Sequence, residues 1–225
     1  MQNNLQASRV WLRPIVCWLY ILTAGSLFIT PVYAIASVPE PQSWRLLANK
    51  HGIQTFSGEL PGSRFMATKH IVELEAAAEQ VLAALGDGSA CAPWLKLCKS
   101  MEVLQRINQS EFLAYAVLNM PWPLSDRDLV FRSKRSEDPA GKRVLVEQLS
   151  QAGAHPKSAL VRMVSDSSFL IEPLAARKVR LTWTIHSDPG GKVSPSMINA
   201  RAPKETRRDL RALVEYLAQS RLHEH

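Results

Sequence analysis

The tripeptide Asp126-Arg127-Asp128 is the part of this sequence whose residue types could most readily do chemistry. Two carboxylates at this spacing could act as a general acid and a general base. Arg127 lies between them, however, and a guanidinium next to carboxylates keeps them ionised and paired. We therefore interpret the tripeptide as a structural salt-bridge group, with an acid–base pair as the alternative.

The rest of the sequence lacks the spacings that catalytic and metal sites require. The motifs GxSxG, HExxH and CxxC and the glycine-rich phosphate loop do not occur. The terminal run His223-Glu224-His225 is the one place where histidine and carboxylate cluster, and chain ends are usually frayed. We therefore expect no catalytic residues, no metal site and no cofactor.

Cys91 and Cys98 could form a redox pair or a structural disulfide. Their spacing does not fit a redox pair of the CxxC type. One straight helix would hold them roughly 10 Å apart, at 1.5 Å per residue, which is too far for a bridge. Pro93 could interrupt such a helix and bring the two together. We favour the disulfide, and two inert buried thiols remain the alternative.

The first 34 residues have the layout of a secretory signal peptide. Arg9 and Arg13 precede an apolar run over residues 15–30, and small residues follow in 31–34. An uncleaved anchor is the alternative, because residues 15–33 are long enough to span a bilayer. In both cases residues 35–225 are exported, and we expect them to form a single domain in the periplasm or another exported compartment, where a disulfide is possible.

The charge distribution limits the partners that we expect. The formal net charge is +7, and basic residues gather between residues 201 and 211. On a helix such a run is usually a solvated face, and the alternative is a surface that meets anionic lipid headgroups. No basic stripe with interleaved aromatic residues is found, so nucleic acid is not an expected partner. We expect a monomer that makes a transient contact with a membrane surface.

Strand-like runs separated by turn residues dominate the middle of the chain. They cover residues 53–56, 65–74, 111–120, 128–133, 143–149, 159–165, 169–171 and 178–186. Helices are predicted over residues 44–49, 75–85 and 92–99, and a last helix is predicted to start near Pro203.

The last helix should carry an apolar stripe, because Leu210, Leu213, Val214 and Leu217 recur with helical spacing. Such a stripe must be buried against another element, and the sheet is the available partner. The sequence therefore predicts an α+β fold in which a mostly antiparallel sheet packs against a long C-terminal helix.

Two motifs resemble those of START domains, a family of lipid-transfer modules. The run PWPLSDRDLVF at residues 121–131 closely resembles the central signature of the family. The run DPGG at residues 188–191, with Ile198 and Asn199 after it, resembles the segment that precedes the last helix of the family. The resemblance covers about residues 44–217.

Smaller matches and one departure complete this resemblance. Trp94 matches a tryptophan in the early helical region of the family, and residues 160–162 resemble one of its strands. Ser194-Pro195-Ser196 replaces the usual order of proline and tryptophan, which affects the geometry expected for the start of the last helix.

The resemblance implies a helix-grip fold, in which a curved antiparallel sheet surrounds the C-terminal helix and encloses a cavity for one apolar molecule. Within the signature, Pro121 and Pro123 should end a strand because proline cannot donate to a sheet ladder. Trp122 should cover the turn. By analogy with the family, Arg127 and Asp128 should form a structural clasp, with a polar contact to the ligand as the alternative.

Alternation along the strands, aligned on the family, predicts which side chains face the cavity. The predicted cavity residues are Ala114, Ala116, Leu118, Leu129, Phe131, Ser133, Glu147 and Trp183 on strands, and Met197, Leu210, Leu213 and Val214 on the last helix. The two alanines should leave free volume, unless larger neighbours fill it. For Glu147 the strand register is open, and a surface position is the favoured interpretation. Residues 150–158 should form a mobile flap at the cavity mouth.

The resemblance also predicts the class of ligand. Relatives that bind phospholipid or ceramide have charged residues at the positions of Cys91 and Leu95, and the acid–base pair of some sterol-binding relatives falls near Ala114 and Ser133. A buried ion without a partner costs several kcal/mol. We therefore expect a lipid with little charge, such as a sterol-like, hopanoid-like or fatty-acyl molecule.

The expected function is that of a non-enzymatic lipid carrier. The alternatives are an aromatase/cyclase-like enzyme of the same superfamily, and a scaffold or regulatory module. A cyclase would need inward-facing polar groups to transfer protons, and the predicted inward faces offer mainly Ser133 and Glu147.

Overall fold

A computed structural model of the chain describes residues 38–140, 142–155 and 158–222, and the side chains of these residues up to 220. The predicted signal peptide at residues 1–34 and the run His223-Glu224-His225 lie outside this part. All of the helices and strands described below belong to one compact unit, residues 36–225.

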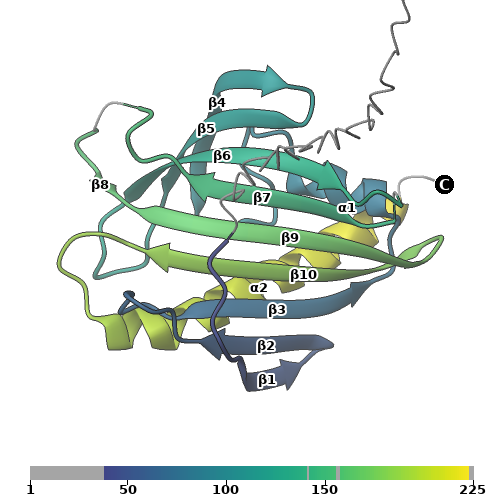
Figure 1. The fold of residues 1–225 in the computed structure, drawn as a ribbon, viewed down its shortest axis with the longest axis horizontal. Helices are drawn as coiled ribbons and strands as arrows, with labels where there is room; N and C mark the ends of the chain where they lie inside the picture. Colours follow the sequence, from purple (N-terminus) through teal and green to yellow (C-terminus); the bar gives the residue numbers. More distant parts are fainter. Residues whose placement is uncertain (1–37, 141, 156–157, 223–225) are drawn as a thin grey trace, which may run out of the picture. The chain divides into compact units, whose positions relative to one another are not determined.

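A single curved sheet forms most of this unit (Figure 1). Its strands are β1 (Arg45–Lys50), β2 (Ile53–Gly58), β3 (Ala67–Leu74), β4 (Cys98–Asn108), β5 (Glu111–Leu118), β6 (Arg127–Glu137), β7 (Val144–Ser150), β8 (Val161–Arg162), β9 (Val164–Ala175) and β10 (Lys178–Asp188). Their order is β1-β2-β3-β10-β9-β7-β6-β5-β4, and β8 pairs with β6. Neighbours are antiparallel, except that β8 runs parallel to β6.

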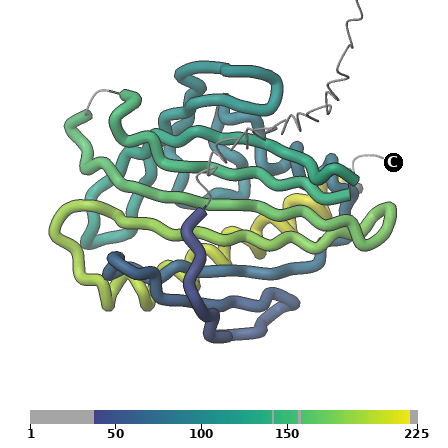
Figure 2. The backbone as a smooth tube through the Cα atoms, in the orientation of Figure 1, coloured from purple at the N-terminus to yellow at the C-terminus, as the bar shows by residue number. Residues whose placement is uncertain are grey.

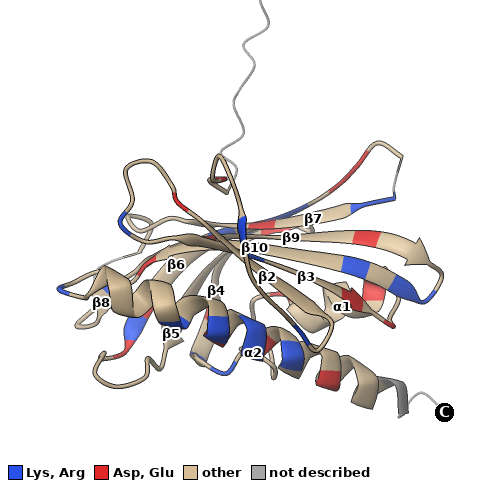
Figure 3. Ribbon diagram, turned by 90° about the horizontal axis from the view of Figure 1, so that it is seen from below, with Lys and Arg blue, Asp and Glu red and all other residues tan. Residues whose placement is uncertain are grey.

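Two helices are described, α1 (Ala78–Leu85) and the long α2 (Pro195–Leu222). Seen from below, α2 crosses one side of the sheet (Figure 3). The tube in Figure 2 shows how the chain curves around it. The predicted α+β helix-grip fold, with an antiparallel sheet around a C-terminal helix, is confirmed.

The helix is fixed to the sheet by leucines in its C-terminal half. Leu210, Leu213 and Leu217 are buried in the main core together with sheet residues such as Val72 and Leu181. Fully burying a leucine side chain contributes about 1.5–3 kcal/mol. This apolar contact holds α2 against the concave face, as the stripe in the sequence predicts. Val214 does not join it, since this side chain is 37% exposed.

The helix begins two turns earlier than predicted, at Pro195 rather than near Pro203. The carbonyl oxygen of Ser194 accepts a hydrogen bond from Ile198 N–H at 3.2 Å. Serine before the first turn and proline within it are both favoured at helix starts. Asn199 then fixes this end, because its Oδ1 accepts a hydrogen bond from Met66 N–H at 2.9 Å.

Two predicted helices are wrong. Residues 44–49 fall largely in strand β1, which pairs with β2 through a tight turn at His51 and Gly52. Both turn residues have positive φ, 54° and 73°, as two-residue hairpin turns require. Residues 92–97 form turns rather than a helix, and β4 starts at Cys98, in a region where no strand was predicted.

A disulfide joins Cys91 and Cys98, whose Cα atoms are 5.7 Å apart. Closing a loop of this length stabilises a fold by roughly 2–3 kcal/mol. Trp94 lies within the loop, is buried, and donates a hydrogen bond from Nε1 to the carbonyl oxygen of Ala84 at 2.7 Å. The loop is therefore fixed at its base by the disulfide and at its centre by the tryptophan.

Arg127 and Asp128 are both buried, but each binds a different segment. Arg127 Nε donates to the carbonyl oxygen of Pro189 at 2.6 Å and so holds the DPGG run before α2. Asp128 accepts two hydrogen bonds from Arg162, at 2.8 and 2.9 Å, and one from Ser158 Oγ at 2.8 Å. The predicted clasp is therefore two separate clasps on neighbouring residues.

The DPGG run also shows why glycine is required at its third position. Gly190 has a φ of 65°, and a Cβ there would lie 2.7 Å from the carbonyl oxygen of Arg162. Only glycine allows this close approach of the two backbones. The Arg127 and Asp128 clasps thus hold both sides of the same contact.

We predict that Arg162→Met destabilises the protein by about 3 kcal/mol, because it leaves the fully buried Asp128 carboxylate without its charged partner. Burial alone would raise the pKa of Asp128, but the hydrogen bonds from Arg162 and Ser158 outweigh it and lower the pKa. The stabilisation is therefore present above the ordinary aspartate pKa and disappears as the pH falls through the folded-state pKa.

Urea denaturation of the variant at neutral and acidic pH measures this effect. Arg180→Met is the matched control, since Arg180 forms an exposed ion pair with Glu73. Such pairs contribute under about 1 kcal/mol. Equal losses of stability in the two variants would contradict the assignment.

Candidate ligand-binding cavity

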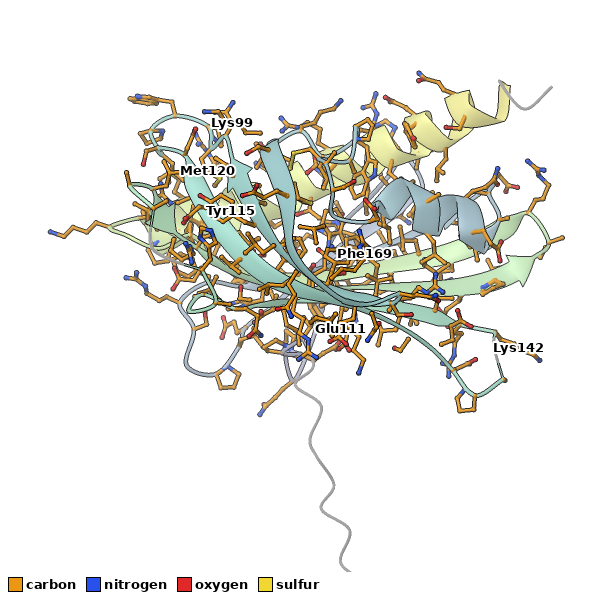
Figure 4. The ribbon with its side chains drawn as sticks, turned by 90° about the horizontal axis from the view of Figure 1, so that it is seen from above. Lys99, Glu111, Tyr115, Met120, Lys142 and Phe169 are labelled. Carbon is orange, nitrogen blue, oxygen red and sulfur yellow. A yellow bond between two sulfur atoms is a disulfide. The ribbon has the colours of Figure 1, made fainter. Side chains whose placement is uncertain are left out.

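A cavity of about 250 Å³ lies between the sheet and the N-terminal half of α2. Its floor is formed by side chains of β3, β5, β6, β9 and β10, and the segment 88–98 forms one wall. Phe169 is one of the floor residues, and Figure 4 shows it in the interior between the sheet and the helices. The lining is mostly apolar.

Several side chains predicted to face the cavity do line it. The structure places Ala116, Leu118, Leu129, Phe131 and Trp183 on its wall. Ala116 lies opposite Leu129 in the β5–β6 ladder, so both point to the same face. The Trp183 ring is held between Phe169, stacked at 5.0 Å, and Trp94, edge-on at 5.8 Å.

Three predicted strand residues lie elsewhere. Ala114 is fully buried in a small cluster with Ala116 and Phe131 and does not reach the cavity. Glu147 points to the opposite face, beside Lys134, which agrees with the favoured surface position and not with a cavity position, and its neighbour Gln148 faces the cavity. This is the one-residue register error that strand alternation allows.

Ser133 lies at a second hollow, of about 540 Å³, beside α1. This hollow is larger than the cavity under α2. Its lining is less apolar, however, and includes the charged side chains Glu79, Asp87, Arg106 and Arg135. We therefore assign the ligand to the cavity under α2.

The side chains that α2 presents to the cavity differ from the predicted ones. The predicted residues were Met197, Leu210, Leu213 and Val214, and none of them lines it. The lining residues recur along one face of its first four turns: Ile198, Arg201, Ala202, Glu205, Thr206 and Asp209. The apolar stripe covers solid core, and the roof over the cavity comes from the turns before it. Because this second face mixes polar and apolar residues, a search for hydrophobic periodicity could not find it.

The cavity is therefore less neutral than the sequence predicted. Arg201 Nη1 donates to the carbonyl oxygen of Trp122 at 3.2 Å, and Glu205 pairs with Arg208 at 2.6 Å. Asp209 is 7% exposed, and its Oδ1 accepts a hydrogen bond of 3.4 Å from Lys96 N–H. Burial is the main cause that raises the pKa of Asp209 to about 6.

Two further polar atoms line the cavity without a hydrogen-bond partner in the described part of the chain. They are Thr68 Oγ1 and Trp183 Nε1, on side chains that are 2% and 5% exposed. The serines of the floor are different, since Ser165 Oγ and Ser187 Oγ bind each other at 2.7 Å.

One end of the cavity is closed by the loop between β5 and β6. Met120, Pro121 and Leu124 of this loop line the cavity. Trp122 was predicted to cover the turn, but its side chain is 87% exposed and does not do so. Lys99 forms an ion pair with Asp126 at the base of the same loop, at 2.7 Å, and Figure 4 shows Lys99 and Met120 at the same end of the fold.

The predicted flap at residues 150–158 is only partly described, because residues 156 and 157 lie outside the structure's described part. Its described residues do not line the cavity. They are held by neighbours instead, since His155 stacks on Tyr115 at 4.8 Å and Ser158 binds Asp128.

The described residues contain neither a metal-binding cluster nor a helix that could span a membrane. No cluster of three or more His, Cys, Asp or Glu side chains among them could hold a metal ion. None of the helices in this part has both the length and the hydropathy needed to cross a bilayer.

The START domain family model matches residues 40–222 of the chain. Among solved structures, the chain is similar to a STAR-related lipid transfer protein from Xanthomonas axonopodis, with 25% identity and a TM-score of 0.71 over 78% of this chain and 98% of that one. It shares its fold with human StAR-related lipid transfer protein 5, with 17% identity and a TM-score of 0.72 over 81% and 89% of the two chains. An uncharacterized protein of Pseudomonas aeruginosa is 20% identical over 188 residues, which cover 82% of this chain and 93% of the relative.

We predict that Asp209→Asn stabilises the protein at about pH 8 and has little effect near pH 4, because the folded-state pKa is raised above the ordinary 3.8. Between pH 3.8 and about 6 the folded chain keeps a proton that the unfolded chain has released, so stability falls as the pH rises through this range and stays low above it. An amide removes this penalty. At about 1.4 kcal/mol per pKa unit, the rise from 3.8 to about 6 corresponds to a gain of roughly 3 kcal/mol in urea denaturation at the higher pH.

The control for this variant is Glu215→Gln, which removes an exposed carboxylate from the same helix. It should change stability by less than about 0.5 kcal/mol at either pH. The account of Asp209 fails if its variant is no more stable than the control at the higher pH.

Proposed function

Because the chain belongs to the START domain family, we propose that it binds one weakly charged hydrophobic molecule under α2 and carries it between membranes. The observation that supports this most directly is the mostly apolar cavity of about 250 Å³. Close-packed protein interiors rarely contain voids larger than a water molecule. A ligand would gain about 25 cal/mol for each Å² of apolar surface that it buries there.

The size of the cavity favours a compact or single-chain ligand. Pockets that hold small molecules usually measure about 300–1,000 Å³, so the cavity, at about 250 Å³, is slightly smaller than this range. A sterol-like, hopanoid-like or single fatty-acyl molecule fits this limit better than a phospholipid with two chains. Entry of a larger molecule would require α2 to move away from the sheet.

The proposed route of entry lies between the N-terminal half of α2 and the β5–β6 loop. The described side-chain hydrogen bonds that hold this half are few and near the surface: those of Asn199 with Met66 and Arg64, and that of Arg201 with Trp122. The C-terminal half is fixed by the buried leucines. The helix could therefore open at one end without leaving the core.

The same end of the fold carries a surface suited to a membrane. Trp122 is exposed beside Pro121 and Met120, and the cations Lys99 and Arg201 lie close by. Tryptophan prefers the level of the lipid headgroups, and basic residues are attracted to anionic lipids. Figure 3 shows further basic residues along α2. We propose that this end docks on the membrane while the ligand passes.

The periplasm is the proposed location. The signal-peptide pattern at residues 1–34 supports export. The Cys91–Cys98 disulfide supports an oxidising compartment, since such bonds are rare in the cytosol.

A cyclase-like enzyme is the second candidate. Asp209 favours it, because a buried acid with a pKa of about 6 in an apolar cavity is suited to proton transfer. We prefer the carrier because Glu205, the second carboxylate on the wall, is paired with Arg208.

The first test asks whether the cavity holds lipid. Protein purified after expression of the full-length chain is extracted with organic solvent, and the extract is analysed by mass spectrometry. We expect one class of weakly charged lipid, and saturable transfer of that lipid between vesicles without a chemical product. Ala202→Trp, on the cavity wall, should reduce the bound lipid at least fivefold, because the larger ring fills the space.

Ala200→Trp is the matched control, since Ala200 is exposed on the same helix and does not line the cavity. Equal lipid content in the two variants would contradict the assigned cavity. Formation of a new product from the bound lipid would favour the enzyme.

The second test concerns the membrane surface. Trp122→Ala should weaken binding to vesicles that contain phosphatidylglycerol by about tenfold, or ~1.4 kcal/mol, because an exposed apolar ring is removed. Trp44→Ala is the control, since Trp44 packs under Lys69, away from the cavity. Vesicle co-sedimentation measures both. If Trp122→Ala binds as tightly as the control, the docking surface is wrongly placed.

A further inference from the structure

The cavity wall contains polar groups that a purely apolar ligand would leave unpaired. Trp183 Nε1 and Thr68 Oγ1 are buried, line the cavity and lack a hydrogen-bond partner within the described residues. Buried polar groups in folded proteins are nearly always hydrogen-bonded. Two such exceptions on one cavity wall indicate a partner that arrives with the ligand.

These two groups lie close together on the concave face. Trp183 is opposite His70 and Ile185 is opposite Thr68 in the β10–β3 ladder, so all four side chains point to the same side. Trp183 and Thr68 are therefore diagonal neighbours, within reach of one small group. The Trp183 ring cannot turn freely, because Phe169 and Trp94 pack against it.

The acceptor on the opposite wall is Asp209. It lines the same cavity and binds the N–H of Lys96, two residues after the Trp94 that contacts Trp183. The cavity thus presents an N–H donor from the floor and a carboxylate acceptor from the roof. Thr68 can donate or accept.

Ligand head groups differ in how well they can bind both the Trp183 N–H and the Asp209 carboxylate. A carboxylate can only accept, so it would leave Asp209 without a donor and would be repelled by its charge. Arg201 also lines the cavity, but its guanidinium is bound to the carbonyl oxygen of Trp122. An ammonium would pair with the Asp209 carboxylate, but it can only donate, so it would leave the Trp183 N–H unpaired. A hydroxyl accepts with its oxygen and donates with its hydrogen, so it satisfies both walls at once.

We propose that the ligand is an uncharged lipid alcohol, whose hydroxyl accepts a hydrogen bond from Trp183 Nε1 and donates one to Asp209. This inference rests on the proposed function, since it names the head group of the molecule in the same cavity. It also gives a role to Asp209, a buried carboxylate on the wall of a mostly apolar cavity.

The test compares three ligands that share a ten-carbon hydrocarbon chain and differ in the head group: 1-decanol, decanoate and decylamine. Protein expressed from the full-length chain is freed of lipid and loaded with the neutral dye Nile red, and each ligand displaces the dye at about pH 8. We expect 1-decanol to bind at least tenfold more tightly than decanoate and more tightly than decylamine, as for a site that loses a buried hydrogen bond with the wrong group. Equal or tighter binding of decanoate or decylamine would overturn the proposal.

Two variants locate the effect. Trp183→Phe keeps a ring but removes the N–H, and should weaken 1-decanol about fivefold while Nile red still binds. Asp209→Asn removes the charge and should raise the affinity for decanoate about tenfold. Glu215→Gln, on the outer face of α2, is the charge control and should change neither. If both cavity variants bind all three ligands as the wild type does, the hydroxyl site does not exist.

The test also separates this proposal from the broader one. If Nile red and the decyl ligands bind but show no preference for the alcohol, the cavity is a lipid site and only the head-group assignment fails. If neither the dye nor any decyl ligand binds, the proposed function fails and the head-group assignment fails with it.

Discussion

The packing of Leu210, Leu213 and Leu217 against the sheet is the contact on which the rest of this structure depends. It anchors the C-terminal half of α2 in solid core, so the N-terminal half can extend over the floor without filling the space beneath it. The small Ala116 and Ala202 help to keep that space open. A cavity needs rigid walls, and the clasps of Arg127 and Asp128 and the Cys91–Cys98 disulfide supply them around its rim.

The cavity also contains groups that do not favour stability. A buried Asp209 carboxylate, the unpaired Thr68 hydroxyl and the unpaired Trp183 N–H each raise the free energy of the ligand-free fold. Proteins usually keep such groups where a function needs them. The cavity wall and the exposed Trp122 are two described parts of the chain that depart from ideal packing. They coincide with the two places where the proposed carrier would meet lipid, the ligand cavity and the membrane surface.

Much of the fold could be predicted from the sequence, but the cavity only in part. The signature at residues 121–131 and the leucine stripe fix the architecture because they encode specific long-range contacts, the Arg127 and Asp128 clasps and the buried helix face. Residues 92–99 were predicted as a helix, but the Cys91–Cys98 disulfide closes this segment into a loop and residues 92–97 form turns. Glu147 was included among the cavity residues in place of Gln148, because the alternation along a strand does not determine which of two neighbouring residues faces inward. Asp209 was missed because the face of α2 over the cavity mixes Ile198 and Ala202 with charged residues.

The account requires that α2 has one anchored half and one half that covers a ligand. Hydrogen–deuterium exchange on the lipid-free protein and on the protein loaded with 1-decanol measures this directly. We predict that residues 195–206 exchange faster than residues 210–217 without ligand and become protected when it binds, while residues 210–217 do not change. Uniform exchange along the helix, unaffected by the ligand, would contradict the account.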